Sequence, residues 1–74
     1  MGSTKINIQD QFLNQSRKKR VKVIITLMSG GELEGFIKSF DNFSVVLEAE
    51  YLELLYKHAI VKIKPVENIS LFNF

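Results

Sequence analysis

The sequence contains no cysteine and no tryptophan, and only one histidine and one proline occur among its 74 residues. Without cysteine the chain can form neither disulfides nor thiolate metal sites, which argues against the class of small secreted, disulfide-rich proteins. No apolar run approaches the roughly 20 residues of a membrane-spanning helix, and the N-terminus lacks the apolar core of a signal peptide. We therefore expect a soluble, cytoplasmic protein with no membrane partner.

The same scarcity of reactive side chains disfavours an enzyme. Nucleophilic catalysis needs a base beside a serine or cysteine, and His58 is the only histidine. No carboxylate pair lies next to His58 in sequence, and no metal-ligand spacing is present. Gly30-Gly31 lacks the lysine and helix of a phosphate-binding loop. We expect no catalytic residue, no metal, no cofactor and no small-molecule substrate.

The apolar content is high for a chain of this length. The residues are 46% hydrophobic and include six phenylalanines. A domain of this size buries only roughly 60% of the surface that its unfolded chain exposes, so stability is marginal unless another contact supports the fold. This composition predicts one small domain that buries surface between subunits as well as within one.

Charge is distributed unevenly along the chain. Residues 1–30 carry six cations and one acid, whereas residues 31–74 carry four cations and seven acids. Such asymmetry predicts a basic surface for a polyanion and an acidic surface elsewhere, although an ordinary mixed surface fits the same numbers. Four of the cations are consecutive, at residues 17–20. That cluster is either a solvated surface or a contact for several phosphates.

The N-terminal part of the chain predicts one helix, over residues 8–19. Ile8, Phe12 and Ser16 recur at a spacing of four residues, with Leu13 beside them, and so mark one face. Asn7 is a suitable N-cap, and an acid and a basic run lie at the helix ends that favour them. Residues 1–7 are predicted to be a flexible tail, with residues 8–65 as the domain and residues 66–74 as a C-terminal tail.

The rest of the chain predicts five strands joined by short turns. Alternating β-branched residues at 21–28 lead to the turn Ser29-Gly30-Gly31, where glycine supplies a positive φ. The next strand spans residues 32–40, and the glycine at its centre, Gly35, indicates a sharp bend or a close backbone approach. Three further strands follow at 43–48, 51–56 and 60–64, the last ended by Pro65. A short helix and five closely spaced strands predict a mainly β, strongly bent antiparallel barrel of the SH3-like type.

A barrel of five strands leaves edges that invite pairing with another chain. The strand at residues 51–56 is apolar at consecutive positions, so both of its faces need cover. If each edge meets a different edge on its neighbour, the contact is head-to-tail and a closed ring follows. A ring also repeats a weak site around a pore, which multiplies affinity through avidity.

The only histidine lies in the short segment Tyr56-Lys57-His58-Ala59, between two apolar runs. That position predicts a strand end or a tight turn. A cation, an imidazole and an aromatic ring at one corner are suited to reading a phosphate and a base edge together. The alternative is a polar turn with a solvated lysine.

Three segments match one known pattern in register and without a gap over about residues 9–65. They are Gln9-Asp10-Gln11-Phe12-Leu13-Asn14 with Arg17-Lys18-Lys19-Arg20, Gly35 with Ser39-Phe40-Asp41-Asn42-Phe43, and Tyr56-Lys57-His58-Ala59-Ile60. On these residues the chain resembles the Hfq family of bacterial RNA chaperones, which are Sm-like proteins. The resemblance implies a hexameric ring of Sm-like barrels. It also implies binding of uridine-rich single-stranded RNA around the pore, on the proximal face that carries the helix, and pairing of small regulatory RNAs with mRNAs.

The resemblance also assigns roles to individual residues. On the proximal face it implies that Phe43 stacks a uracil, that Lys57 and His58 line the pore, and that other side chains bind or support the base, namely Gln9, Asn42 and Tyr56. Many relatives carry the longer glutamine where this chain has Asn42, so its reach to the base is shorter here. At the lateral rim the resemblance implies RNA contacts from Asn14, Arg17, Lys18 and Arg20.

The distal face, opposite to the helix, departs from the family pattern. Relatives read A-rich RNA there with an aromatic ring and neutral side chains. This chain instead has Thr26, Gly30, Gly31, Glu53 and Lys62 at the matching places, with Glu32 and Glu34 nearby. Because a stacking ring is missing and carboxylates repel phosphate, we expect distal A-rich binding to be weakened, altered or absent.

Two other functions remain compatible with the same residues. One is an SH3-like barrel that binds peptides in an aromatic groove, although such grooves usually contain the tryptophan that this chain lacks. The other is an Sm-type scaffold ring without RNA chaperone activity. The mass of the native particle separates the first alternative from a ring, and binding of uridine oligomers separates the second from a chaperone.

Overall fold

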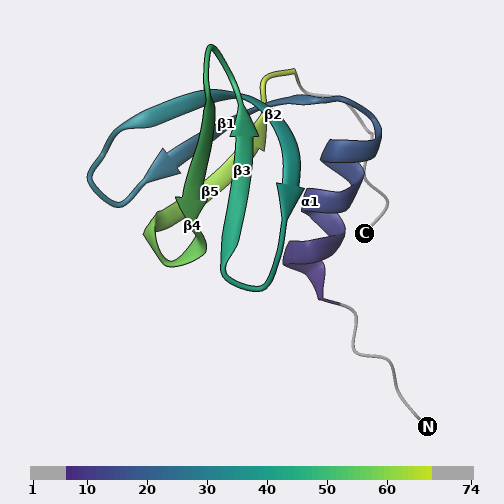
Figure 1. The fold of residues 1–74 in the computed structure, drawn as a ribbon, viewed down its shortest axis with the longest axis horizontal. Helices are drawn as coiled ribbons and strands as arrows, with labels where there is room; N and C mark the ends of the chain where they lie inside the picture. Colours follow the sequence, from purple (N-terminus) through teal and green to yellow (C-terminus); the bar gives the residue numbers. More distant parts are fainter. Residues whose placement is uncertain (1–6, 68–74) are drawn as a thin grey trace, which may run out of the picture.

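The computed structural model describes residues 7–67, which form one helix and a five-stranded sheet (Figure 1). The elements in chain order are α1 (Ile8–Lys18), β1 (Lys22–Leu27), β2 (Glu32–Phe40), β3 (Ser44–Glu48), β4 (Leu52–Tyr56), the 3₁₀ turn η1 (Lys57–Ala59) and β5 (Ile60–Pro65). All strand pairs are antiparallel, in the order β4-β3-β2-β1-β5. The expected architecture, a helix followed by a strongly bent sheet of five strands, is confirmed. Within the described part of the chain no helix is long and apolar enough to span a membrane.

Helix α1 begins at the predicted cap. The side-chain oxygen of Asn7 accepts a hydrogen bond from the backbone N–H of Asp10 at 3.2 Å, which satisfies one of the unpaired donors of the first turn. Leu13 and Ser16 are buried against the sheet, as the spacing of four predicts. Ile8 is 65% exposed instead, and it lies along an open groove between α1 and β5.

The core is formed by one face of the sheet and one face of the helix. In β1 the side chains of Val23 and Ile25 are completely buried, whereas their neighbours in sequence point outward. This alternation is the two-residue period of a strand that is covered on one side. The buried side chains that complete the core are Leu13, Val21, Ile37, Val45 and Leu47.

The bend of the sheet depends on strand β2. A Cβ atom placed on Gly35 would lie 2.5 Å from the carbonyl oxygen of Glu48 on β3, closer than real contacts allow. Only glycine therefore lets the two backbones approach this closely, as its position within the strand predicts. A bulge between Ile37 and Ser39 interrupts the same β2–β3 pairing, and bulges bend and twist a strand further.

Element boundaries differ from the expected ones by about one residue. The helix ends at Lys18 with Lys19 as its C-cap, and β4 begins at Leu52 rather than one residue earlier, inside the hairpin loop. The sequence predicts that Pro65 follows β5, whereas in the structure Pro65 is the last residue of β5 and pairs with Val23. A proline that lacks an N–H is tolerated at such a terminal position of an edge strand.

Two further expectations concern the hairpin glycines and the chain ends. Gly30 has a φ of 99°, as expected for the turn, but Gly31 does not adopt a positive φ. The predicted tails lie largely outside residues 7–67, so the division into tail, domain and tail stays a prediction.

The contact at Gly35 provides a stability test. We expect Gly35→Ala to lower the free energy of unfolding by about 1–3 kcal/mol, the usual cost of overpacking, because the backbone of Glu48 cannot move aside cheaply. Gly31→Ala is the matched control, since only the Ser29 hydroxyl lies within reach, at 3.8 Å, and should change stability by less than about 0.5 kcal/mol. Urea denaturation measures both. Equal effects of the two substitutions would contradict this account of the bend.

Candidate nucleic-acid interface

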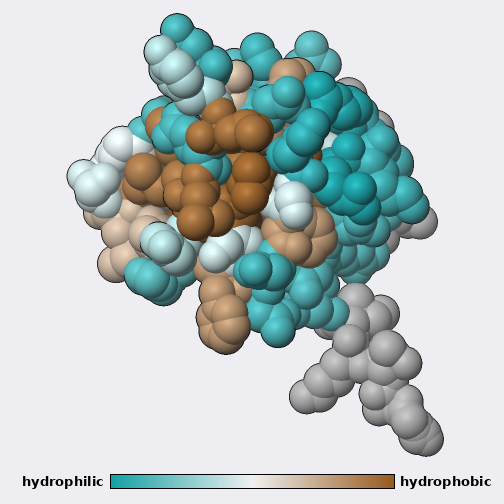
Figure 2. Space-filling model, in the orientation of Figure 1, coloured by the Kyte–Doolittle hydropathy of each residue, from teal (hydrophilic) through white to brown (hydrophobic). Residues whose placement is uncertain are grey.

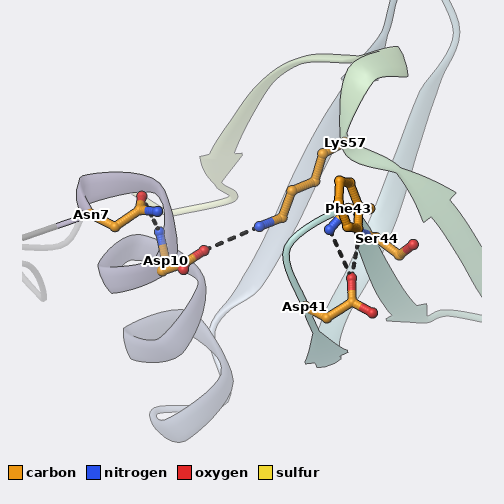
Figure 3. Close-up of polar contacts among 6 residues, drawn as sticks. All are labelled: Asn7, Asp10, Asp41, Phe43, Ser44 and Lys57. Carbon is orange, nitrogen blue, oxygen red and sulfur yellow. Dashed lines mark hydrogen bonds and ion pairs between the residues drawn. The ribbon is translucent and has the colours of Figure 1, made fainter.

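The turn between β2 and β3 presents an exposed aromatic ring. The carboxylate of Asp41 accepts hydrogen bonds from the backbone N–H groups of Phe43, at 2.9 Å, and Ser44, at 2.7 Å (Figure 3). This Asx-type turn fixes the backbone on both sides of the phenylalanine. The Phe43 side chain is 75% exposed, while Asn42 beside it is also exposed. A large aromatic ring is thus held in solvent by a rigid turn. Strand β3 begins at Ser44, one residue later than expected, because Phe43 belongs to this turn.

The two backbone hydrogen bonds to Asp41 determine its ionisation. They lower the pKa of this carboxyl group below its ordinary value because they stabilise the charged form, and the positive charge of Lys57 acts in the same direction. Asp41 is therefore ionised at neutral pH.

The predicted turn around the histidine is the 3₁₀ turn η1, between β4 and β5. The backbone N–H of Lys57 donates to the carbonyl oxygen of Phe43 at 2.8 Å, which ties η1 to the aromatic turn. The rings of Tyr56 and His58 are stacked, with centroids 5.8 Å apart and planes 15° apart, and His58 is exposed. Five of the six expected proximal residues, all except Gln9, thus lie at these two adjoining turns.

Helix α1 contributes its first turn to the same end of the molecule. The ammonium group of Lys57 reaches across to the Asp10 carboxylate at 3.1 Å (Figure 3). Gln9 and Lys57 line one small pocket with Leu13. The structure therefore brings together all the expected proximal residues, drawn from three segments that are far apart in sequence.

The expected rim residues lie at the other end of α1. Arg17 donates to the side-chain oxygen of Asn14 at 2.7 Å, and Lys18 is exposed. Arg20 has a φ of 52°, which a residue with a Cβ rarely adopts. Its guanidinium lies 4.6 Å from the centre of the Phe36 ring, and one of its nitrogens lies 3.3 Å from the carboxylate of Glu48.

The side chains that pair with this rim are not evident from the sequence. Phe36 also lies 5.9 Å from the ammonium of Lys22, which in turn lies 3.7 Å from the carboxylate of Glu34. The pairing of β1 with β2 places Lys22 opposite Phe36, and that of β2 with β3 places Phe36 opposite Glu48. A strand register could have revealed both neighbours, but single-strand periodicity does not specify a register.

The expected distal residues are only partly neighbours. Thr26 on β1 lies opposite Glu32 on one side and Lys62 on the other, and its hydroxyl donates to the Glu32 carboxylate at 3.5 Å. Gly30 and Gly31 are exposed in the adjoining hairpin. Glu53 lies on β4, at the opposite edge of the sheet, so one chain does not bring it to the others. Among the described residues no three acidic or histidine side chains are placed to hold a metal ion.

A bent five-stranded antiparallel sheet preceded by a helix, with a Ser-Phe-Asp turn tied to a Tyr-Lys-His turn, defines an Sm-like domain. The family model described as "Hfq protein" matches residues 8–70 of the chain. The chain belongs to the Hfq family. The likeness expected from the sequence is confirmed.

Known relatives of the chain include several close sequences. A protein from Exiguobacterium sibiricum named RNA-binding protein Hfq is 54% identical to this chain, over 89% of this chain and 81% of the relative. The corresponding Geobacillus kaustophilus protein is also 54% identical, over 86% of this chain and 87% of the relative.

Solved structures show the same fold. A crystal structure described as the pleiotropic translational regulator Hfq is 31% identical, with a TM-score of 0.75, over 77% of this chain and 97% of that one. An Hfq protein from Anabaena, at 22% identity and a TM-score of 0.74, covers 78% of this chain and 95% of that one. At that identity the Anabaena protein supports the fold alone.

The Asp41 turn gives a pH-dependent prediction. Because the pKa of Asp41 is lower in the folded chain than in the unfolded one, its carboxylate stabilises the fold above the unfolded pKa of about 3.9. That stabilisation is lost as pH falls through the lowered folded pKa. We expect Asp41→Asn to have a lower Tm than the wild type at neutral pH, and we expect this difference to shrink below about pH 4.

Thermal melts across this pH range measure the effect, with Glu50→Gln, which removes another exposed carboxylate, as control. A difference in Tm for Asp41→Asn that stays constant into the acid range would show that ionisation of Asp41 does not support the turn.

Proposed function

We propose that this protein binds uridine-rich single-stranded RNA on the face formed by the Asp41–Phe43 turn, η1 and the start of α1. The observation that carries the proposal is the exposed Phe43 ring, held beside Lys57 by the backbone hydrogen bond between the two turns. A base that stacks on such a ring gains about 1–3 kcal/mol. The relatives of this chain named RNA-binding protein Hfq support the same function.

The groups around Phe43 supply the hydrogen bonds that stacking alone does not provide. His58 and Asn42 are exposed beside it and carry hydrogen-bond donors and acceptors suited to a base edge and a ribose. Gln9 approaches from α1, and Tyr56 stacks on His58 and so supports its orientation. In this proposal the base stacks on the ring of Phe43, and the edge of the base forms hydrogen bonds with these polar side chains.

A ring of six copies is the proposed assembly, and the two ends of the sheet support it. Strands β4 and β5 are the edges, so each chain carries two different unpaired edges that can meet head-to-tail. Figure 2 shows an apolar patch over β3 and β4. The exposed residues Leu52 and Leu54 and the half-buried Val46 lie on that face. On the β5 side, Ile8 and Val61 are exposed along the apolar groove beside α1. The number six comes from the family resemblance.

Within this function, the rim would bring small regulatory RNAs and mRNAs together in the cytoplasm. Arg17 and Lys18 are exposed on the outer surface of α1, and their charges would reduce the repulsion between the phosphates of two RNA strands. The rim thus supports a chaperone rather than a scaffold ring without RNA.

Stacking on Phe43 is the first prediction of this proposal. Phe43→Ala should weaken binding of a uridine oligomer by about 5-fold to 100-fold per site, because the base loses its platform. Fluorescence anisotropy with labelled oligomer measures the affinity. Tyr51→Ala is a matched control, since Tyr51 is 72% exposed but lies in the β3–β4 loop, at the other end of β3. Equal losses in the two variants would remove Phe43 from the site.

The mass of the native particle tests the assembly. Native mass spectrometry should give six times the mass of one chain for the wild type. Leu54→Lys should shift the particles toward smaller species, because it buries a charge in the proposed subunit contact. Ser29→Lys adds the same charge on the exposed β1–β2 turn and should leave the ring intact. A wild type that is monomeric at micromolar concentration would refute the ring.

The distal face leads to a third prediction. The Thr26 hydroxyl lies against the Glu32 carboxylate, and Lys62 lies on the neighbouring strand, so these residues offer mixed charge where relatives carry a stacking ring. We expect an adenosine oligomer to bind more weakly than a uridine oligomer of the same length. Tight adenosine binding that survives the double substitution Phe43→Ala, His58→Ala would contradict this prediction.

A further inference from the structure

The ammonium group of Lys57 is paired within its own chain. It lies 3.1 Å from the Asp10 carboxylate, and the two side chains are only 12% and 37% exposed. The pair joins η1 to α1 across 47 positions of sequence. Because both groups are partly withdrawn from water, their attraction is stronger and less screened by salt than that of a surface pair.

Each partner of this pair is itself held in place. Asp10 lies in the first turn of α1, where its backbone N–H donates a hydrogen bond to the side-chain oxygen of the capping residue Asn7. The Lys57 ammonium lies 5.7 Å from the centre of the Phe40 ring, and the Lys57 backbone is bonded to Phe43. The lysine therefore has a fixed direction relative to the exposed ring on which a base would stack (Figure 3).

We propose that Asp10 is a positioning residue for base selection: it holds Lys57 as an oriented hydrogen-bond donor and keeps its charge from serving as a phosphate contact. This inference rests on the uridine site proposed above. An ammonium group has three donors, and one of them is taken by Asp10, so two are left for acceptors on a ligand.

The chemistry of the bases explains why a fixed ammonium would select uracil. At the place where uracil carries its O4 carbonyl oxygen, an acceptor, adenine carries its amino group, a donor, and the acceptor ring nitrogens of adenine lie elsewhere on its edges. A lysine held in one direction therefore meets an acceptor in one base and a donor in the other. A lysine free to move would turn toward the nearest phosphate instead, and it would bind every base alike.

Charge pairing also affects the response to salt. Single-stranded RNA releases counterions in proportion to the phosphates that a protein neutralises, with a slope of about −0.7 per phosphate. Because Asp10 already neutralises Lys57, this lysine should add no phosphate contact in the wild type. Without the carboxylate it should add one.

The test is Asp10→Asn, which removes the charge with little change of shape. Affinities for uridine and adenosine oligomers of equal length are measured at two salt concentrations. The preference for uridine should fall roughly tenfold, the size of one charge-assisted hydrogen bond. The slope of log affinity against log salt should steepen by about 0.7 for the added phosphate contact.

Three further variants distinguish positioning from a general structural effect. In a Lys57→Met background, Asp10→Asn should have no further effect on preference or slope, because Asp10 acts through the lysine. Asp10→Glu keeps the carboxylate and should retain the wild-type slope. Glu50→Gln removes an exposed carboxylate of the β3–β4 loop, away from Lys57, and it should leave both preference and slope unchanged.

The outcomes separate this inference from the function on which it rests. If the wild type prefers uridine but Asp10→Asn weakens both oligomers in parallel with an unchanged slope, the positioning role is wrong and the uridine site stands. If Asp10→Asn changes preference and slope as much in the Lys57→Met background as in the wild type, the positioning role is also wrong. If the wild type binds no uridine oligomer, the proposed function itself fails, and this inference fails with it.

Discussion

The close approach of Gly35 to the backbone of Glu48 is the constraint on which the other features depend. It lets β2 and β3 approach more closely than a side chain at position 35 would permit, and the bulge after Ile37 adds to the bend. A flat sheet of five strands would leave its apolar face open to water. The bent sheet instead wraps around a small core that Leu13 of α1 completes.

The bend also brings the proximal residues together. The β2–β3 turn and η1 lie at the same end of the sheet, joined by the hydrogen bond between Lys57 and Phe43. Helix α1 packs against β2, and this places Asp10 within reach of Lys57. Short polar contacts among distant segments thus hold the backbone around an exposed aromatic ring, so the proposed RNA-binding surface would be organised before any ligand arrives.

The cations of the chain are not equivalent. Lys57, Arg20 and Lys22 each lie beside a carboxylate of the same chain, and Arg20 and Lys22 also lie near the Phe36 ring. The left-handed backbone of Arg20, which costs about 1–3 kcal/mol, belongs to the end of α1, where the backbone N–H groups of Arg20 and Val21 donate to the carbonyl oxygens of Arg17 and Ser16 as in a Schellman motif. Arg17 and Lys18, in contrast, form no carboxylate pair among the described residues. Counting charges in sequence treats all of these groups alike.

The sequence alone determined the elements, the glycine at the bend and the residues at the proximal end. The reason is that hydrophobic period, turn residues and capping residues act over a few neighbouring positions, and the Ser-Phe-Asp and Tyr-Lys-His segments are specific to one family. Only the tertiary structure decided which charges are paired. The contacts of Lys57 with Asp10 and of Arg20 with Phe36 and Glu48 depend on strand register and on the bend. Those features arise from packing between segments that are far apart in the chain, and no local pattern encodes them.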